Sequence, residues 1–149
     1  MADSDLIKLY SGRILDLAAD IPHAGRLPAP QATVRRRAPQ CGSTVTVDVV
    51  VENGRIAAFA QDVRACALGQ ASAAILGAQV IGQDRATLAG LRDQVQAMLA
   101  ADGHVPPPPF EAYEVLVPAR AFRNRHASIL LALEAVVEAM DDAATRAAS

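Results

Sequence analysis

At 149 residues, with 52% hydrophobic residues and a formal net charge of −2, the chain suits one globular domain with a buried core. The near-balanced charge and the 3% aromatic content argue against a nucleic-acid-binding surface, and the basic triplet Arg35–Arg37 is expected on a solvated strand edge rather than in a docking patch. No apolar stretch of about 18 residues occurs, so we expect a cytoplasmic protein without a membrane partner.

The first half of the chain is predicted to form one helix and a small antiparallel sheet. Apolar residues recur at helical spacing over residues 5–20, and proline and glycine then interrupt regular structure up to residue 30. Three extended segments follow, at residues 31–37, 44–51 and 56–63. Asn53–Gly54 separates the last two, and Asn-Gly is the strongest short hairpin signal. The sequence therefore predicts a β-hairpin.

The second half is predicted to be helical. Small apolar residues over 67–81 predict a closely packed helix, and residues 84–103 predict a second one with a spaced leucine stripe. The prolines of residues 106–109 predict an extended connector. A last helix has an apolar face that ends at Met140, so residues 141–149 are expected to fray.

These elements predict the fold class. One helix, three strands and three further helices give an α+β domain, with helices packed on one face of a three-stranded antiparallel sheet. Too few residues follow the proline connector to build a second core. We therefore expect a single domain over residues 1–149, ordered over residues 5–140.

Two cysteines flank the predicted hairpin. Cys41 precedes its first strand, Cys66 follows its second, and antiparallel partners return to the same end of a sheet. We therefore expect the two thiols close together, an arrangement that suits a metal, a cluster or a persulfide better than a structural disulfide. Burial of each cysteine as a small hydrophobic residue is the alternative. Cys66 is also expected at a helix N-terminus, where free amides lower the pKa of a thiol.

Motifs for other chemistry are missing from the sequence. It has no glycine-rich phosphate loop, no Gly-x-Ser-x-Gly elbow, no His-Glu-x-x-His and no Cys-x-x-Cys. Its carboxylates are scattered over predicted helix faces, which gives no support for acid–base catalysis. His23 and His104 lie in loops and are expected to be solvated. A scaffold or carrier is therefore favoured over an enzyme, and the question of catalysis stays open.

Several of these features together resemble one protein family. Cys41–Gly42, the hairpin, Cys66 at a helix start and the segment Arg-His-Ala-Ser-Ile-Leu at residues 125–130 are similar to the U-type iron–sulfur cluster scaffolds, the IscU, SufU and NifU N-terminal family. The resemblance covers residues 6–140. In that family the three motifs are Cys-Gly-Asp, a cysteine that opens a small-residue helix, and commonly His-Cys-Ser-Ile-Leu. The resemblance implies a SufE/NifU-like fold and implies Cys41, Cys66 and His126 as ligands of iron, a cluster or zinc.

The chain departs from the family pattern at two positions. Ala127 stands where the family has its third cysteine, and Ser43 stands where it has the aspartate of Cys-Gly-Asp. Three remaining ligands suit zinc with an open fourth position, or a [2Fe-2S] cluster completed by a second subunit or an exogenous thiol. Because the family's aspartate is associated with cluster lability, its loss favours retention, whereas the lost thiolate weakens binding. The long stretch between Cys66 and His126 is similar to the SufU branch, and His126 itself to the IscU branch.

The resemblance leaves three functions open. The chain is expected to be an iron–sulfur cluster scaffold or sulfur relay, a zinc-binding sulfur acceptor, or an interaction module that kept the fold and lost the chemistry. Cys41, on a glycine-containing loop, is the candidate persulfide acceptor, and His126 is a ligand, a proton relay or an ordinary helix-start histidine. The implied partners are a cysteine desulfurase and apo iron–sulfur proteins, and a homodimer is a further possibility.

Overall fold

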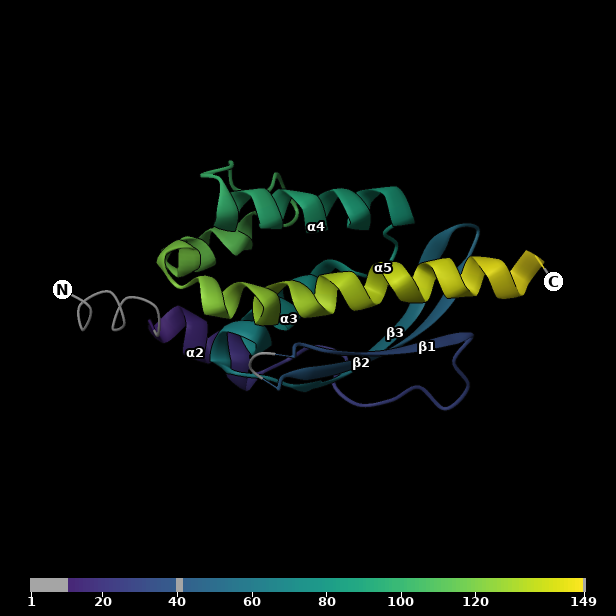
Figure 1. The fold of residues 1–149 in the computed structure, drawn as a ribbon. Coiled ribbons are helices and arrows are strands. Elements are labelled where there is room, and N and C mark those ends of the chain that lie inside the picture. The colour runs from purple at the N-terminus through teal and green to yellow at the C-terminus, as the bar shows by residue number, and fades with distance from the viewer. Residues whose placement is uncertain (1–10, 40–41, 149) are drawn as a thin grey trace.

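A computed structural model describes residues 11–39 and 42–148 of the chain and shows an α+β fold (Figure 1). Cys41 and the first part of the helix predicted over residues 5–20 lie outside the described residues. The elements are α2 (Gly12–Ala19), β1 (Ala32–Arg37), β2 (Thr44–Glu52), β3 (Arg55–Arg64), α3 (Ala67–Gln79), α4 (Arg85–Ala100), the 3₁₀ segments η1 (Glu111–Ala121) and η2 (Arg123–Arg125), and α5 (His126–Ala148).

The sheet forms as the sequence predicts. Its strand order is β1-β2-β3 with both pairs antiparallel, and β2 and β3 make the hairpin. Asn53 and Gly54 have φ angles of 54° and 75°, the left-handed pair that a two-residue hairpin turn requires. One face of the sheet is apolar, because alternate side chains along each strand share a face. Its buried residues include Val34, Val45, Val47, Val49, Ile56 and Phe59.

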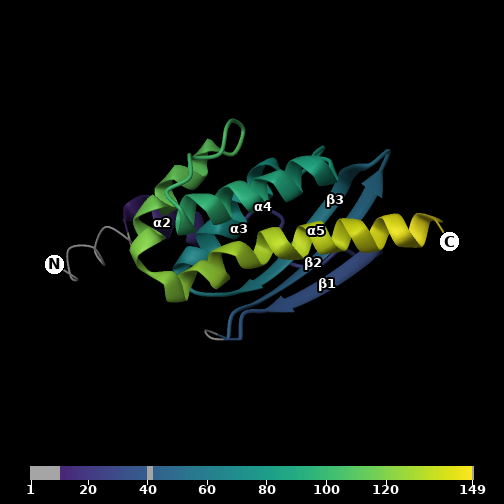
Figure 2. The same ribbon diagram turned by 45° about the horizontal axis from the view of Figure 1, so that its top comes forward.

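The helices cover this apolar face, which confirms the predicted fold class (Figures 1 and 2). The long helix α5 lies along β1 and β2, and α3 and α4 both pack against α5. Helix α3 also contacts α2 and is buried on nearly all sides. Its alanine and glycine residues allow this close approach, as the small-residue pattern predicts.

The chain between α4 and α5 differs from the sequence-based expectation. The predicted extended connector is followed by an 11-residue run of 3₁₀ helix, η1, which the sequence did not predict. Tyr113 anchors this run, because its side chain is fully buried and its hydroxyl donates to the Ser72 carbonyl oxygen at 2.9 Å. Leu116 and Ala119 are buried on the same segment. Tertiary contacts with α3 therefore stabilise a helix type that local sequence favours weakly.

Helix α5 continues to Ala148, through the segment where the sequence predicts fraying. Ala143 is 1% exposed, so the extra turns still bury apolar surface against the sheet. The Asp141 carboxylate also accepts two hydrogen bonds from the Arg85 guanidinium of α4. Among the described residues, no helix is both long enough and apolar enough to cross a bilayer.

Candidate thiolate site at the start of α3

The residues around Cys66 come from three parts of the chain that meet at one end of the sheet. Cys66 is the N-cap residue of α3, directly after β3, as the sequence predicts. Ser43 immediately precedes β2, and the β2 residue that follows it, Thr44, pairs with Arg64 at the end of β3. Helix α5 begins at the same end, which brings Ser128 against both segments. The start of α5 and the two hairpin ends thus form one site.

A short hydrogen-bonded chain links the three side chains. The Ser128 hydroxyl lies 3.5 Å from the Cys66 sulfur and 3.0 Å from the Ser43 hydroxyl. Both serines are buried, at 2% and 4% exposure, whereas Cys66 is half-buried and reaches solvent. When Cys66 is ionised, its sulfur has no proton to give, so Ser128 is the donor in this pair. Ser43 thus contacts Ser128 in the protein interior.

The surroundings of Cys66 favour its thiolate. Burial raises the pKa of the Cys66 thiol, but hydrogen bonds from Ser128, from the Gly69 and Leu68 amides and from the Arg125 side chain outweigh this effect. The pKa of Cys66 therefore lies below its usual range. The two amides belong to the first turn of α3, where N–H groups have no partner inside the helix. A lowered thiol pKa at a partly exposed position is the usual environment of a reactive cysteine.

His126, the first residue of α5, is held by the backbone of η1. Its Nε2 atom lies 2.8 Å from the Ala119 carbonyl oxygen. Because a carbonyl oxygen can only accept, Nε2 carries the proton and, in the neutral ring, Nδ1 carries the lone pair. Histidine ligands of metals commonly have this arrangement, with one ring nitrogen donating to a carbonyl. His126 is thus in a tautomer that suits a ligand.

Gly69 permits the close packing of α3 against α5 at this site. A Cβ atom at position 69 would lie 2.6 Å from the Ser128 hydroxyl oxygen, 2.8 Å from the Ala65 Cβ and 3.1 Å from the Ser128 carbonyl oxygen. Any larger residue must therefore push Ser128 away from the first turn of α3. Neither Ser128 nor Gly69 was singled out from the sequence as a functional residue. The only signal was that Ser128 lies two residues after His126 in the motif of residues 125–130.

The structure describes two of the three predicted ligands. Cys66 and His126 lie at the same end of the fold, through α3 and the first turn of α5, and Ala127 of that turn is exposed. Within residues 11–39 and 42–148, no three histidine, cysteine or carboxylate side chains form a metal-binding group. Cys41 lies outside these residues, so the convergence of Cys41, Cys66 and His126 stays a prediction. His23 and His104 are exposed, and the His23 ring meets the edge of Phe59 at 6.0 Å.

The role of Ser128 can be tested by titration of the thiol. We expect Ser128→Ala to raise the pKa of Cys66, because the hydroxyl that donates to the thiolate is lost. The pH dependence of alkylation by iodoacetamide, measured in a Cys41→Ala background, reports this pKa. Ser43→Ala is the matched control, since it removes a buried hydroxyl one step farther from the sulfur and should raise the pKa less. An unchanged titration in Ser128→Ala would contradict the assignment.

Comparison with known proteins agrees with this architecture. The family described as NifU-like N terminal domain matches residues 9–112 of the chain. Among solved structures, the N-terminal part of a NifU-like protein from Brucella abortus, named as nitrogen-fixing, superposes with a TM-score of 0.91 at 35% identity. This similarity covers 95% of the present chain and 98% of that chain. No curated protein matches the sequence.

Two more distant structures share the fold. A protein of Fervidobacterium islandicum, described as a putative iron–sulfur cluster assembly scaffold for the SUF system, has a TM-score of 0.78 at 18% identity and covers 89% of this chain and 96% of its own. A hypothetical protein has a TM-score of 0.77 at 22% identity, with 95% and 99% coverage. The family match extends over most of the chain, and the Brucella similarity extends over nearly all of it. The chain therefore belongs to the NifU-like N-terminal domain family.

Proposed function

We propose that this chain is an iron–sulfur cluster assembly scaffold that holds its cargo through Cys66, His126 and Cys41. The observation that carries the proposal is the stabilised thiolate of Cys66 at the partly exposed start of α3. Family membership supplies the class of cargo. Thiolate and imidazole are the donors that iron–sulfur clusters and zinc accept.

Each ligand has a separate task in this proposal. Cys66 binds the cargo as a thiolate, and its hydrogen bonds lower the free-energy cost of giving up the thiol proton. His126 offers Nδ1, while its Nε2–H is anchored on Ala119 and fixes the ring. Cys41, three residues before β2 in the sequence, is the proposed first acceptor of sulfur from a cysteine desulfurase. Its thiolate attacks the outer sulfur of the enzyme's persulfide, and the enzyme's own thiolate leaves.

The proposal is tested by the iron, zinc and acid-labile sulfide content of protein purified and reconstituted without oxygen. We expect the wild-type chain to retain iron and sulfide, and Cys66→Ser to lose nearly all of both because the stabilised thiolate is gone. His126→Ala should retain less than wild type. His104→Ala is the matched control, since it removes an exposed histidine in a loop. Retention of iron and sulfide by Cys66→Ser would refute the proposal.

A second candidate, a zinc-dependent sulfur acceptor, is favoured by the small donor set. The thiolates of Cys66 and Cys41 and the imidazole of His126 suit zinc with an open fourth position as well as they suit a cluster. Purified protein with zinc and no sulfide, which gains a sulfur adduct from a desulfurase and cysteine, would select this function. Absence of metal, sulfide and sulfur adduct would leave an interaction module without the chemistry.

Restoring the family's third cysteine should strengthen binding. We expect Ala127→Cys to raise the iron or zinc retained after reconstitution several-fold, because a further thiolate adds both charge and a bond. Ala127 is exposed in the first turn of α5, so a thiol there reaches solvent. Ala147→Cys is the control, since it adds an exposed thiol near the opposite end of α5. Equal retention by the wild type and Ala127→Cys would show that position 127 does not face the site.

A further inference from the structure

The outer face of the sheet, away from the helices, carries a group of three exposed arginines. Strand alternation divides the basic triplet of β1 between the two faces. Arg36 points toward the helices and donates to Glu138 at 3.1 Å, whereas Arg35 and Arg37 point outward and are exposed. Arg64 of β3 is exposed on the same outer face. We call Arg35, Arg37 and Arg64 the arginine face.

The strand register places these arginines on either side of Thr44 and Thr46 of the central strand β2. Arg37, Thr44 and Arg64 form one row across β1, β2 and β3, because Thr44 pairs with both arginines. Arg35, Thr46 and Asp62 form the next row. The outer strands of such a row are about 10 Å apart, so the guanidinium groups flank a hydroxyl-lined strip. A hollow of about 510 Å³ lies over these rows.

The arginine face retains an excess of positive charge. Among the residues that the structure describes, Asp62 is the one carboxylate lining this hollow, and it pairs with Arg64 at 3.7 Å. Arg26, at the rim of the hollow, is neutralised by the buried carboxylate of Asp48 at 2.7 Å. Within the described residues, no carboxylate pairs with Arg35 or Arg37. Three arginines against one carboxylate leave two positive charges on a chain whose net charge is −2.

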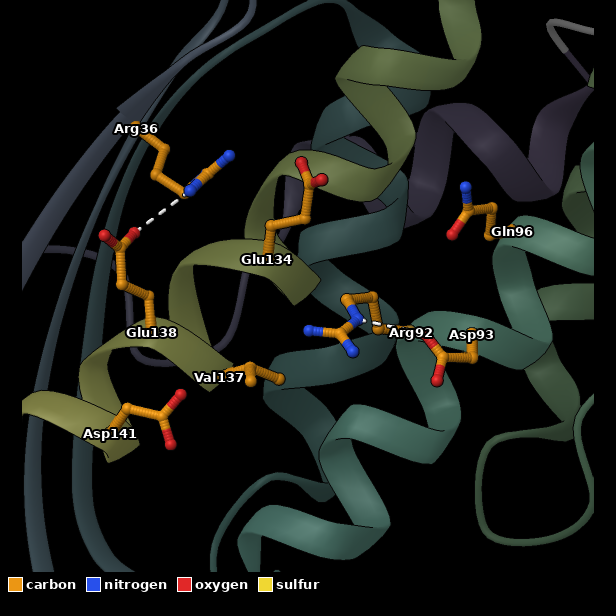
Figure 3. A pocket seen from close by; sticks show the side chains of 8 residues that line it. All are labelled: Arg36, Arg92, Asp93, Gln96, Glu134, Val137, Glu138 and Asp141. Atoms are coloured by element: carbon orange, nitrogen blue, oxygen red, sulfur yellow. Dashed lines mark hydrogen bonds and ion pairs between the residues drawn. The ribbon is translucent and has the colours of Figure 1, made fainter. Parts of the chain in front are cut away.

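The excess of positive charge is confined to the outer face of the sheet, because the hollow on the helical side of the molecule does not share it. A hollow of about 400 Å³ between α4, α5 and β1 is lined by four carboxylates and two arginines, and each of these arginines has a carboxylate partner (Figure 3). Arg36 binds Glu138, and Arg92 binds Asp93 at 3.1 Å. Both arginines of this hollow are therefore neutralised within the chain, whereas Arg35 and Arg37 on the outer face are available to a partner.

We propose that the arginine face docks a carboxylate-rich surface of a partner protein. Guanidinium groups bind carboxylates in a forked geometry, and the threonine hydroxyls between them supply further donors. The row Arg37–Thr44–Arg64 lies at the end of the sheet where Ser43 and Cys66 are found, one residue from Ser43 and two from Cys66. A partner on this face therefore lies beside the thiolate site. The role of such a partner in sulfur or metal exchange rests on the proposed function, whereas the docking itself does not.

An acidic peptide tests the docking independently of any cargo. Fluorescent octaglutamate is titrated with metal-free protein whose thiols are blocked by iodoacetamide, with binding followed by anisotropy at about 20 mM salt, where exposed charges are weakly screened. We expect Arg35→Gln combined with Arg64→Gln to weaken binding about fivefold, the effect of two exposed ion pairs. Asp62→Asn should tighten binding about twofold, since it removes the carboxylate of this face. Arg146→Gln is the matched control, because Arg146 is an exposed arginine near the C-terminal end of α5. This variant should change binding less than twofold.

Three results would overturn the proposal. Absence of peptide binding would refute it, as would equal loss of binding in the Arg146→Gln control, which would indicate attraction without a site. Tighter binding of inorganic phosphate than of the peptide, lost in the double variant, would identify a small-anion site instead. Because the thiols are blocked, none of these outcomes depends on metal or sulfur, so failure of docking and failure of the proposed function are separable.

Discussion

Gly69→Ala is expected to lower the free energy of unfolding by about 2–3 kcal/mol, in the range of overpacked cores. The added methyl group would lie 2.6 Å from the Ser128 hydroxyl and 3.1 Å from the Ser128 carbonyl oxygen, and backbone cannot move aside as a flexible side chain can. The Ser128 hydroxyl must rotate away, and the Ala65 Cβ at 2.8 Å and the Ser128 carbonyl oxygen must shift with their backbone, which loosens the packing of α3 on α5. The pKa of Cys66 should therefore rise in the same variant, because the Ser128 hydroxyl moves away from the sulfur.

Urea unfolding and alkylation of Cys66 measure the two effects. Gly90→Ala is the matched control, because Gly90 lies inside α4 and a Cβ atom there meets nothing within 4 Å. That substitution should stabilise the protein by about 0.5–1 kcal/mol, the usual gain of alanine over glycine in a helix. If Gly69→Ala is as stable as Gly90→Ala, then α3 and α5 do not pack as closely at Gly69 as these distances indicate.

Asp48→Asn is expected to destabilise the protein by about 2–3 kcal/mol at neutral pH, as loss of a buried, charge-assisted hydrogen-bond group does. The Asp48 side chain is fully buried and accepts from Arg26 at 2.7 Å, from the Leu27 amide at 3.0 Å and from Thr33 at 2.6 Å. An amide in its place turns an N–H toward at least one of these donors. The loop that carries Arg26 and Leu27 thereby loses its main attachment to the sheet.

The pH dependence of this effect has a definite sign. Burial raises the pKa of Asp48, but hydrogen bonds from Arg26, Thr33 and the Leu27 amide outweigh it, so the pKa lies below its usual range. The stabilisation is therefore complete above the unfolded-state pKa of about 4 and is lost as the pH falls through the lower folded-state value. The stability gap between the wild type and Asp48→Asn should narrow below about pH 4.

Urea unfolding at a series of pH values tests this dependence. Asp16→Asn is the control, because Asp16 is exposed on α2 and its loss should change stability by less than about 0.5 kcal/mol. A stability gap that stays constant down to pH 3 would show that the Asp48 carboxylate is not the stabilising group.

Local features of the sequence were sufficient for much of the fold. The hairpin turn follows from Asn53–Gly54, because few other residue pairs adopt two successive positive φ angles at low cost. The start of α3 at Cys66 and the start of α4 after Asp84 follow from where apolar periodicity begins. The predicted layers then follow, since each amphipathic element must bury its apolar face.

Contacts between distant segments decided the remaining features. Segment η1 is helical because Tyr113 binds Ser72 of α3, and α5 extends past Met140 because Ala143 packs on the sheet. Asp48 alternates with valines and lies on the outer face of the sheet, yet it is fully buried because the loop that carries Arg26 covers it. None of these partners is close in sequence, so hydrophobic periodicity contains no information about them.

The candidate site, like the fold, has some features that follow from the local sequence and others that depend on contacts between distant segments. The sequence by itself determined that a cysteine begins a small-residue helix and that a histidine begins the last helix, because both statements depend on local pattern. Only the tertiary structure decided that Ser128, 62 residues from Cys66, donates to that thiol and that Ala119 orients the His126 ring. The pKa of a thiol is the balance between desolvation and hydrogen bonds. Both terms depend on which side chains the packed helices bring within about 3.5 Å of the sulfur, and packing is a property of the whole chain.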